Sequence, residues 1–163
     1  MLLEREDINP DQADTLNGRT PLWWAAKGRH EGVVKMLLER KDVNPDQADA
    51  KGDWTPLSLA AENGHEGIVT RLLERKEVNP DAADTKCGTT PLWLAAQNGH
   101  EGVVKMLLER KEVNPEAADT KFGATPLWLA AQNGNEGVVR RLLEREEVNP
   151  DRAETTDDRT PLL

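Results

Sequence analysis

The stretch TPLWLAAQNGHEGVVKMLLERKEVN, residues 90–114, is one copy of a pattern that fills the chain of 163 residues. Residues 79–113 and 114–148 differ at seven positions, so 28 of 35 match. Three motifs recur in phase, and a fixed period of this length indicates an internal structural repeat. Thr-Pro-Leu begins at Thr20, Thr55, Thr90, Thr125 and Thr160, Asn-Pro at Asn9, Asn44, Asn79, Asn114 and Asn149, and Leu-Leu-Glu-Arg at Leu2, Leu37, Leu72, Leu107 and Leu142.

The first part of each unit predicts a short helix. In residues 55–89, Thr55 can cap an N-terminus and Pro56 occupies the first helical position, where proline is tolerated. Leu57, Ala60 and Ala61 then form one apolar face at helical spacing. An Asn-Gly pair follows, and glycine ends a helix readily because it adopts the left-handed conformation at little cost.

The second part predicts another helix, from Glu66 to about Arg75, with an apolar stripe running from Ile68 to Leu73. A long loop rich in Asn, Pro, Asp and Gly connects it to the next unit. Neither helix is long enough to be stable alone in water. Each unit must therefore bury its apolar faces against its neighbours, which predicts an all-α solenoid.

We expect a single array over residues 1–163, with full units at 20–54, 55–89, 90–124 and 125–159. The half-unit 1–19 and the truncated unit 160–163 interrupt the pattern at the two ends, as in a segment cut from a longer array. End units lack one stacking interface, so we expect them to be the least stable, or to associate end to end with another copy.

The pattern T-P-L-x-L-A-A-x-x-G-H-x-x-V-V-x-x-L-L, followed by V-N, resembles the ankyrin repeat over the whole chain. The resemblance implies a solenoid of stacked antiparallel helix pairs with long hairpin-like finger loops. It also implies a concave face, formed by finger loops and first helices, on which partner proteins bind. Near-identical units of this kind are similar to the arrays of large fungal ankyrin proteins, and equally to consensus-designed arrays.

The units depart from the usual ankyrin pattern in length and in one position. They span 35 residues rather than about 33, and no glycine follows the second helix, so we expect the finger to be extended or looped differently. The histidine of the usual T-P-L-H is replaced by Trp23, Ser58, Trp93 and Trp128. We expect that a hydrogen bond from this position to the preceding threonine is lost and that aromatic packing takes its place.

Composition indicates a soluble intracellular chain, which we assign to the cytoplasm. The net charge is −9, which argues against binding to nucleic acid or to an anionic membrane. No apolar run approaches the roughly 20 residues needed to span a bilayer. Cys87 is the single cysteine, which fits a reducing compartment.

No residue set predicts catalysis, a metal site or a cofactor. His30, His65 and His100 occupy one repeat position at the start of the second helix, so we interpret them as structural. Histidines of different units are too far apart to share a zinc ion. Glu39, Arg40 and their equivalents recur in every unit, which predicts a solvated face with local charge pairing. We expect Cys87 in an exposed loop rather than as a nucleophile.

Positions that vary between copies are the candidates for partner binding. They lie before each Thr-Pro-Leu, in the finger loops and at the ends of the first helices. Trp54 and Phe122 are the strongest candidates, because aromatic side chains are frequent interface anchors. The candidate residues are Arg19, Trp23, Trp54, Ser58, Asn63, Cys87, Thr89, Trp93, Gln97, Asn98, Phe122, Ala124, Trp128, Gln132 and Asn133.

Two alternatives remain open at this point. The tryptophans at the shared position form either a packing ladder or a partly exposed strip for ligand contact. The function is either non-catalytic binding of a protein partner or that of a designed or excised scaffold without an evolved partner.

Overall fold

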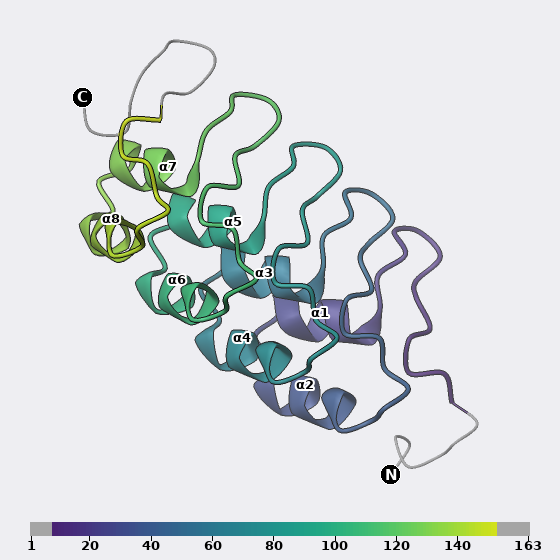
Figure 1. The fold of residues 1–163 in the computed structure, drawn as a ribbon. Helices are drawn as coiled ribbons and strands as arrows, with labels where there is room; N and C mark the ends of the chain where they lie inside the picture. Colours follow the sequence, from purple (N-terminus) through teal and green to yellow (C-terminus); the bar gives the residue numbers. More distant parts are fainter. Residues whose placement is uncertain (1–7, 153–163) are drawn as a thin grey trace.

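The computed structural model describes residues 8–152, and within this range it contains eight α-helices and no strands (Figure 1). This confirms the predicted all-α fold of stacked helix pairs. The first helices of the four pairs are α1 (Pro21–Lys27), α3 (Pro56–Glu62), α5 (Pro91–Gln97) and α7 (Pro126–Gln132), and the second helices are α2 (Glu31–Leu38), α4 (Glu66–Leu73), α6 (Glu101–Leu108) and α8 (Glu136–Leu143).

The first helices begin as the sequence predicts. The threonine before each proline has extended backbone, and its hydroxyl oxygen accepts a hydrogen bond from the third residue of the helix, as Thr90 does from the backbone N–H of Trp93 at 3.2 Å. The glycine after each of the last three first helices lies in the left-handed region, with φ of 67° at Gly64. In the first pair Arg29 has this conformation instead. The second helices are shorter than predicted, since α4 ends at Leu73 and not near Arg75.

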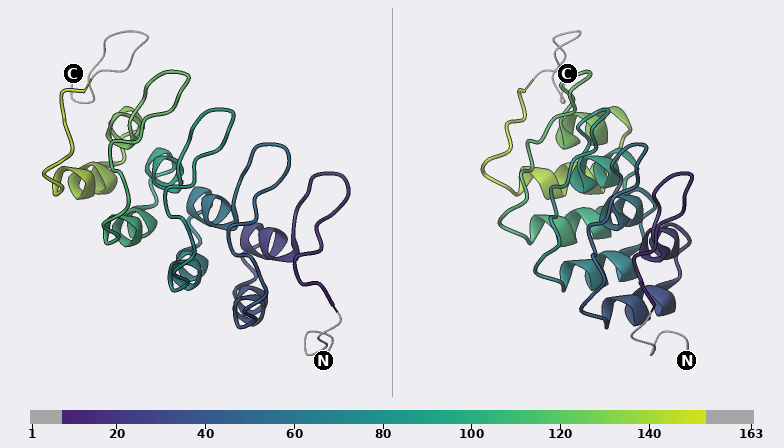
Figure 2. Two further views of the ribbon diagram at one scale, coloured as in Figure 1. Left: turned by 45° about the vertical axis from the view of Figure 1, so that its right-hand side comes forward. Right: turned by 90° about the vertical axis from the view of Figure 1, so that its right-hand side faces the viewer.

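The helix pairs stack into a two-row array. The first helices pack on one another in one row and the second helices in the other. The finger loops project beside the row of first helices, as the two views of Figure 2 show. We call this side, formed by the finger loops and α1, α3, α5 and α7, the finger face. The core runs continuously between the rows and is built from the apolar stripes, with Leu57, Ile68, Leu92 and Leu107 fully buried.

His65 and His100 join neighbouring pairs, as their structural interpretation predicts, whereas His30 in the first pair is exposed. The ring Nδ1 of His65 lies 3.0 Å from the carbonyl oxygen of Ala26, and the ring Nε2 of His100 lies 2.9 Å from that of Glu62. In the last pair Asn135 donates in the same way to the carbonyl oxygen of Ala96, at 2.9 Å. Each of these side chains thus reaches from the start of a second helix to the end of the preceding first helix.

The repeated arginines correct the expectation of a merely solvated face. Arg75 donates from Nη1 to the carbonyl oxygen of Leu38 at 2.7 Å, and Arg110 donates likewise to Leu73 at 2.8 Å. Arg75 also pairs with Glu77, two residues later, rather than with the adjacent glutamate. These arginines therefore connect the end of one second helix to the next unit.

The finger loops are irregular loops rather than paired strands. In residues 79–89, the carboxylate of Asp84 organises the tip through hydrogen bonds to the backbone N–H groups of Lys86, Cys87 and Thr89, at 2.8–2.9 Å. Direct backbone bonds join adjacent loops at two places, from the N–H of Thr120 to the carbonyl oxygen of Cys87 and from the N–H of Ala50 to that of Asn17, both at 2.7 Å. The expected extended finger is thus held by side chains more than by a backbone ladder.

The expectations for the chain ends fall mostly outside the described residues. Of the half-unit 1–19, the structure describes residues 8–19 as a finger loop. The truncated unit 160–163, together with Leu2 and Leu3, lies outside them.

Candidate functional site

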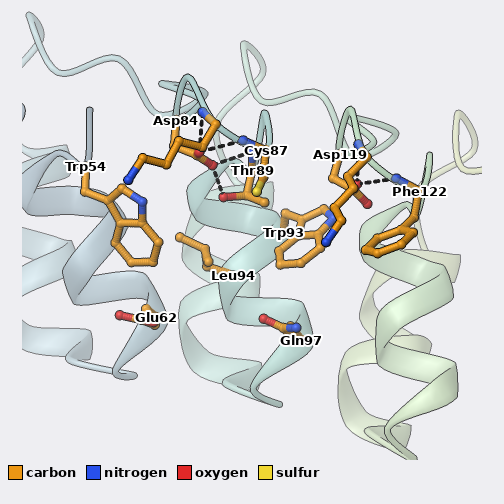
Figure 3. A pocket seen from close by; sticks show the side chains of 12 residues that line it. Trp54, Glu62, Asp84, Cys87, Thr89, Trp93, Leu94, Gln97, Asp119 and Phe122 are labelled. Carbon is orange, nitrogen blue, oxygen red and sulfur yellow. Dashed lines mark hydrogen bonds between the residues drawn. The ribbon is translucent and has the colours of Figure 1, made fainter. Parts of the chain in front are cut away.

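A groove with a volume of about 500 Å³ opens on the finger face between successive finger loops (Figure 3). Aromatic side chains bound it: Trp54 at one end, Phe122 at the other, and Trp93 between them. Leu94 lies between Trp54 and Trp93, and the first helices contribute Glu62 and Gln97. The groove therefore combines an apolar interior with a few polar groups, as ligand and peptide sites commonly do.

The aromatic walls differ in exposure. Phe122 is 43% exposed, whereas Trp93 is only 9% exposed and Trp54 is half-buried. Trp93 is held in place because its indole Nε1–H donates to the carbonyl oxygen of Ala124, at 2.9 Å. Trp93, Leu94, Ala124 and Leu129 form a second small apolar cluster, on which Trp54 and Trp128 pack. The groove thus has a rigid floor and more accessible ends.

Trp23 and Trp93, at the shared repeat position, are buried and also make a polar contact. Trp23 donates to the carbonyl oxygen of Trp54 at 3.0 Å, as Trp93 does to that of Ala124, so these two indoles bridge to the next finger loop. Ser58 breaks this series, and its hydroxyl lies 3.0 Å from that of Thr55. The expectation that this position loses its bond to the threonine is therefore wrong for Ser58.

The carboxylates at the groove are already engaged in structure. Burial alone would raise the pKa of Asp84, but hydrogen bonds from the Thr89 hydroxyl and from backbone N–H groups outweigh it and hold the pKa below its usual value. Asp119 binds the N–H groups of Lys121, Phe122 and Ala124 in the same manner. These carboxylates shape the finger tips and are not placed for acid–base chemistry.

The structure brings six of the predicted residues together at the groove: Trp54, Cys87, Thr89, Trp93, Gln97 and Phe122. Cys87 is partly buried, although we expected it in an exposed position. Three other candidates are buried, with exposures of 2% for Trp23, 3% for Ser58 and 2% for Ala124, so their side chains cannot contact a partner directly.

The remaining candidates lie outside the groove. Arg19 stacks its guanidinium 4.3 Å from the centre of the Trp23 ring and pairs with Asp49 at 3.6 Å. Asn98 is exposed, and its side chain donates to the carbonyl oxygen of Leu94 at the end of α5. The others are Asn63, Gln132 and Asn133, which are exposed, and Trp128, which is half-buried.

Sequence reasoning missed Lys86, Lys121 and Leu94 at the groove. The two lysines occupy one repeat position, shared with Lys51, and a residue copied between units was interpreted as scaffold. The signal that could have identified them is that each lysine is the only basic residue of its finger loop.

Among residues 8–152, no group of His, Cys, Asp or Glu side chains is arranged to hold a metal ion. In the same range, every helix is too short or too polar to cross a membrane.

Comparison with protein families identifies the repeat. A model of three ankyrin repeats matches residues 1–84 and 42–119, and a model of the single ankyrin repeat matches residues 122–154. The chain therefore belongs to the ankyrin repeat family. Proteins of this family are generally protein–protein interaction modules and typically lack catalytic activity. None of the curated proteins matches the chain.

Proposed function

We propose that this chain is a non-catalytic module that binds a protein partner on its finger face, with the groove between Trp54 and Phe122 at the centre. The single cysteine fits a reducing compartment, and we place this activity in the cytoplasm.

The observation that carries the proposal is the clustering of irregular positions. Trp54, Cys87, Thr89 and Phe122 each differ from their counterparts in the neighbouring units, and all four line one groove. The second helices also differ between units, as at Met36 and Arg71, but they carry no aromatic side chain. Exposed aromatic side chains beside a preformed hollow are also typical anchors of protein interfaces.

Alanine substitution on the two faces tests the proposal. The probe is a peptide selected for binding to the full chain from a random-sequence display library. We expect Trp54→Ala and Phe122→Ala to weaken its binding at least about tenfold, as interface anchors do, without changing the circular dichroism. Lys35→Ala, Met36→Ala and Arg71→Ala on the second helices are the matched controls. Loss of binding in these controls, with Trp54→Ala and Phe122→Ala unaffected, would reject the finger face.

The same experiment addresses the alternative of a scaffold without an evolved partner. A scaffold of this kind has no preferred surface, so independently selected peptides would map to unrelated positions. Repeated selection of peptides that require Trp54 and Phe122 supports an evolved site.

A second candidate activity, end-to-end self-association, is favoured by the open face of the first helix pair. Val33 is 40% exposed, whereas its counterparts Ile68 and Val103 are fully buried by the preceding pair. Gly32 likewise faces open space, while a side chain at Gly67 would meet the carboxylate of Glu31. A surface that is buried at the inner interfaces is thus uncovered at this end.

Sedimentation velocity over a range of concentrations tests self-association. We expect concentration-dependent dimers that Val33→Glu abolishes, because a charge would be buried in the contact. A chain that remains monomeric at its highest soluble concentration rules out this activity.

A further inference from the structure

The finger face of this acidic chain carries a set of exposed or partly exposed cations. Three of its carboxylates, those of Asp49, Asp84 and Asp119, are buried within their finger loops. Others are partly exposed, and those of Asp46 and Asp81 accept backbone N–H groups of the next unit. The cations of this face are Arg19, Lys27, Lys51, Lys86 and Lys121. The second helices, in contrast, expose Glu31, Glu39, Glu66, Glu74, Glu101, Glu109, Glu136 and Glu144.

Three of these cations form a row. Lys51, Lys86 and Lys121 occupy the same position in successive finger loops, and all three are exposed. No ion pair joins them to another residue of the described part of the chain. Lys86 and Lys121 line the groove itself, with the Lys121 ammonium 4.7 Å from the centre of the Phe122 ring. Two lysines of the row thus line the aromatic groove, and Lys51 stands at the same position of the preceding finger loop.

The spacing of the row suits an extended chain. The first helices of successive units contact one another, and packed helices generally lie about 8–10 Å apart, which gives the approximate repeat distance of the units. A polyproline-II segment rises about 3.1 Å per residue with three residues per turn, so it places every third side chain on one edge about 9 Å apart. The spacing of the units and the spacing of every third residue in polyproline II agree, so one such segment can contact three successive lysines.

We propose that the groove binds a polyproline-II segment of a partner protein that carries carboxylates at every third residue. These carboxylates pair with Lys51, Lys86 and Lys121, and apolar side chains on the adjacent edge enter the groove against Trp54 and Leu94. This inference rests on the proposed function and adds the chemistry of the partner. A nucleic acid is disfavoured because the chain as a whole carries a charge of −9.

Fluorescence anisotropy with defined peptides and the full chain tests this inference. The probe is the labelled peptide EPLEPLEPL, which presents glutamate on one edge and leucine on another. The comparison peptides are EEELPLPLP, with the same composition but clustered charge, and KPLKPLKPL. We expect EPLEPLEPL to bind at least about tenfold tighter than either, and to weaken as salt is added.

Substitution of the lysine row provides the matched control. Exposed ion pairs are worth about twofold to fivefold each, so Lys51→Ala, Lys86→Ala and Lys121→Ala together should weaken EPLEPLEPL about tenfold or more. The triple variant Lys76→Ala, Lys105→Ala and Lys111→Ala makes the same change in net charge away from the groove. It should leave the affinity unchanged.

Several outcomes would overturn the inference: no binding of EPLEPLEPL, tighter binding of KPLKPLKPL, equal losses in both triple variants, or preferential binding of a single-stranded DNA of equal length. These outcomes are separable from the proposed function. If binding of the library-selected peptides still requires Trp54 and Phe122 but not the lysine row, the acidic polyproline-II partner is rejected and the proposed binding face stands. If binding of those peptides requires the second helices instead, both the acidic partner and the proposed binding face are rejected.

Discussion

Replacing Trp93 with phenylalanine tests whether the indoles hold adjacent units together. The substitution removes the Nε1–H that donates to the carbonyl oxygen of Ala124 at 2.9 Å. That oxygen keeps its second bond, from the N–H of Asp119 at 3.1 Å, so the loss is that of one hydrogen bond, about 0.5–1.5 kcal/mol. The smaller ring also leaves space at a site that is 9% exposed, which adds on the order of 1 kcal/mol. We therefore expect a total destabilisation of roughly 2 kcal/mol.

Trp24 provides the control for this substitution. It is 47% exposed, and its indole bond to Asp14 is long, at 3.3 Å, and lies at the surface. Trp24→Phe should therefore change the free energy of unfolding by less than about 0.5 kcal/mol. Trp23→Phe, which loses the bond to Trp54, should resemble Trp93→Phe.

Urea unfolding followed by circular dichroism at 222 nm is the assay, because fluorescence would change with the removal of a tryptophan. Differences in the free energy of unfolding are taken at the midpoint urea concentration, and all variants are fitted with one common dependence of that free energy on urea. Equal effects of Trp93→Phe and Trp24→Phe would show that the bridge between units contributes nothing measurable, and would refute the reasoning.

Three further predictions concern the stack and its charges. Leu107→Ala should lower the free energy of unfolding by about 2–5 kcal/mol, because this side chain is fully buried. Leu143→Ala, at a position that is 43% exposed, should lower it far less, and urea unfolding measures both. Burial raises the pKa values of Asp46 and Asp81, so the folded chain binds protons more tightly there than the unfolded chain. The resulting stabilisation is present below about pH 4 and is lost as the pH rises through the folded pKa values. The stability of the double variant Asp46→Asn and Asp81→Asn relative to the parent, measured by thermal unfolding, should therefore increase from pH 3 to pH 7. A difference that stays constant with pH would contradict this. Amide hydrogen exchange should be slowest in α4 and α6, which are covered on both sides, and faster in α2; uniform exchange would contradict the stacked account.

The fold follows from the sequence because each unit repeats the same local signals. The Thr-Pro start, the apolar stripe and the Asn-Gly end act within one helix, so their effect can be predicted from neighbouring residues. The stack follows in turn, since short helices with one apolar face must be covered.

The contacts between units were harder to predict, because they join residues that lie more than 30 positions apart. The sequence predicts local charge pairing for Arg75, which the structure has with Glu77, but it does not predict the bond from Arg75 to the carbonyl oxygen of Leu38. The sequence does not distinguish packing from binding for Trp23 and Trp93, and only the position of the next finger loop shows that their indoles donate to its carbonyl oxygens.

The groove was partly predictable for a similar reason. Variation between copies identified Trp54 and Phe122, but it could not identify Lys86, which recurs between units and is placed at the groove only by the shape of the finger loop. It also selected Ser58 and Ala124, which the packing of the helices buries.

The most direct test of the central claim is the hydrogen-exchange footprint of a peptide selected from a random library, measured on the full chain by mass spectrometry. The account predicts added protection in residues 79–89 and 114–124 and in α5, where the groove lies, and no change in the second helices. Protection confined to α2, α4, α6 and α8, with the finger loops unchanged, would contradict it.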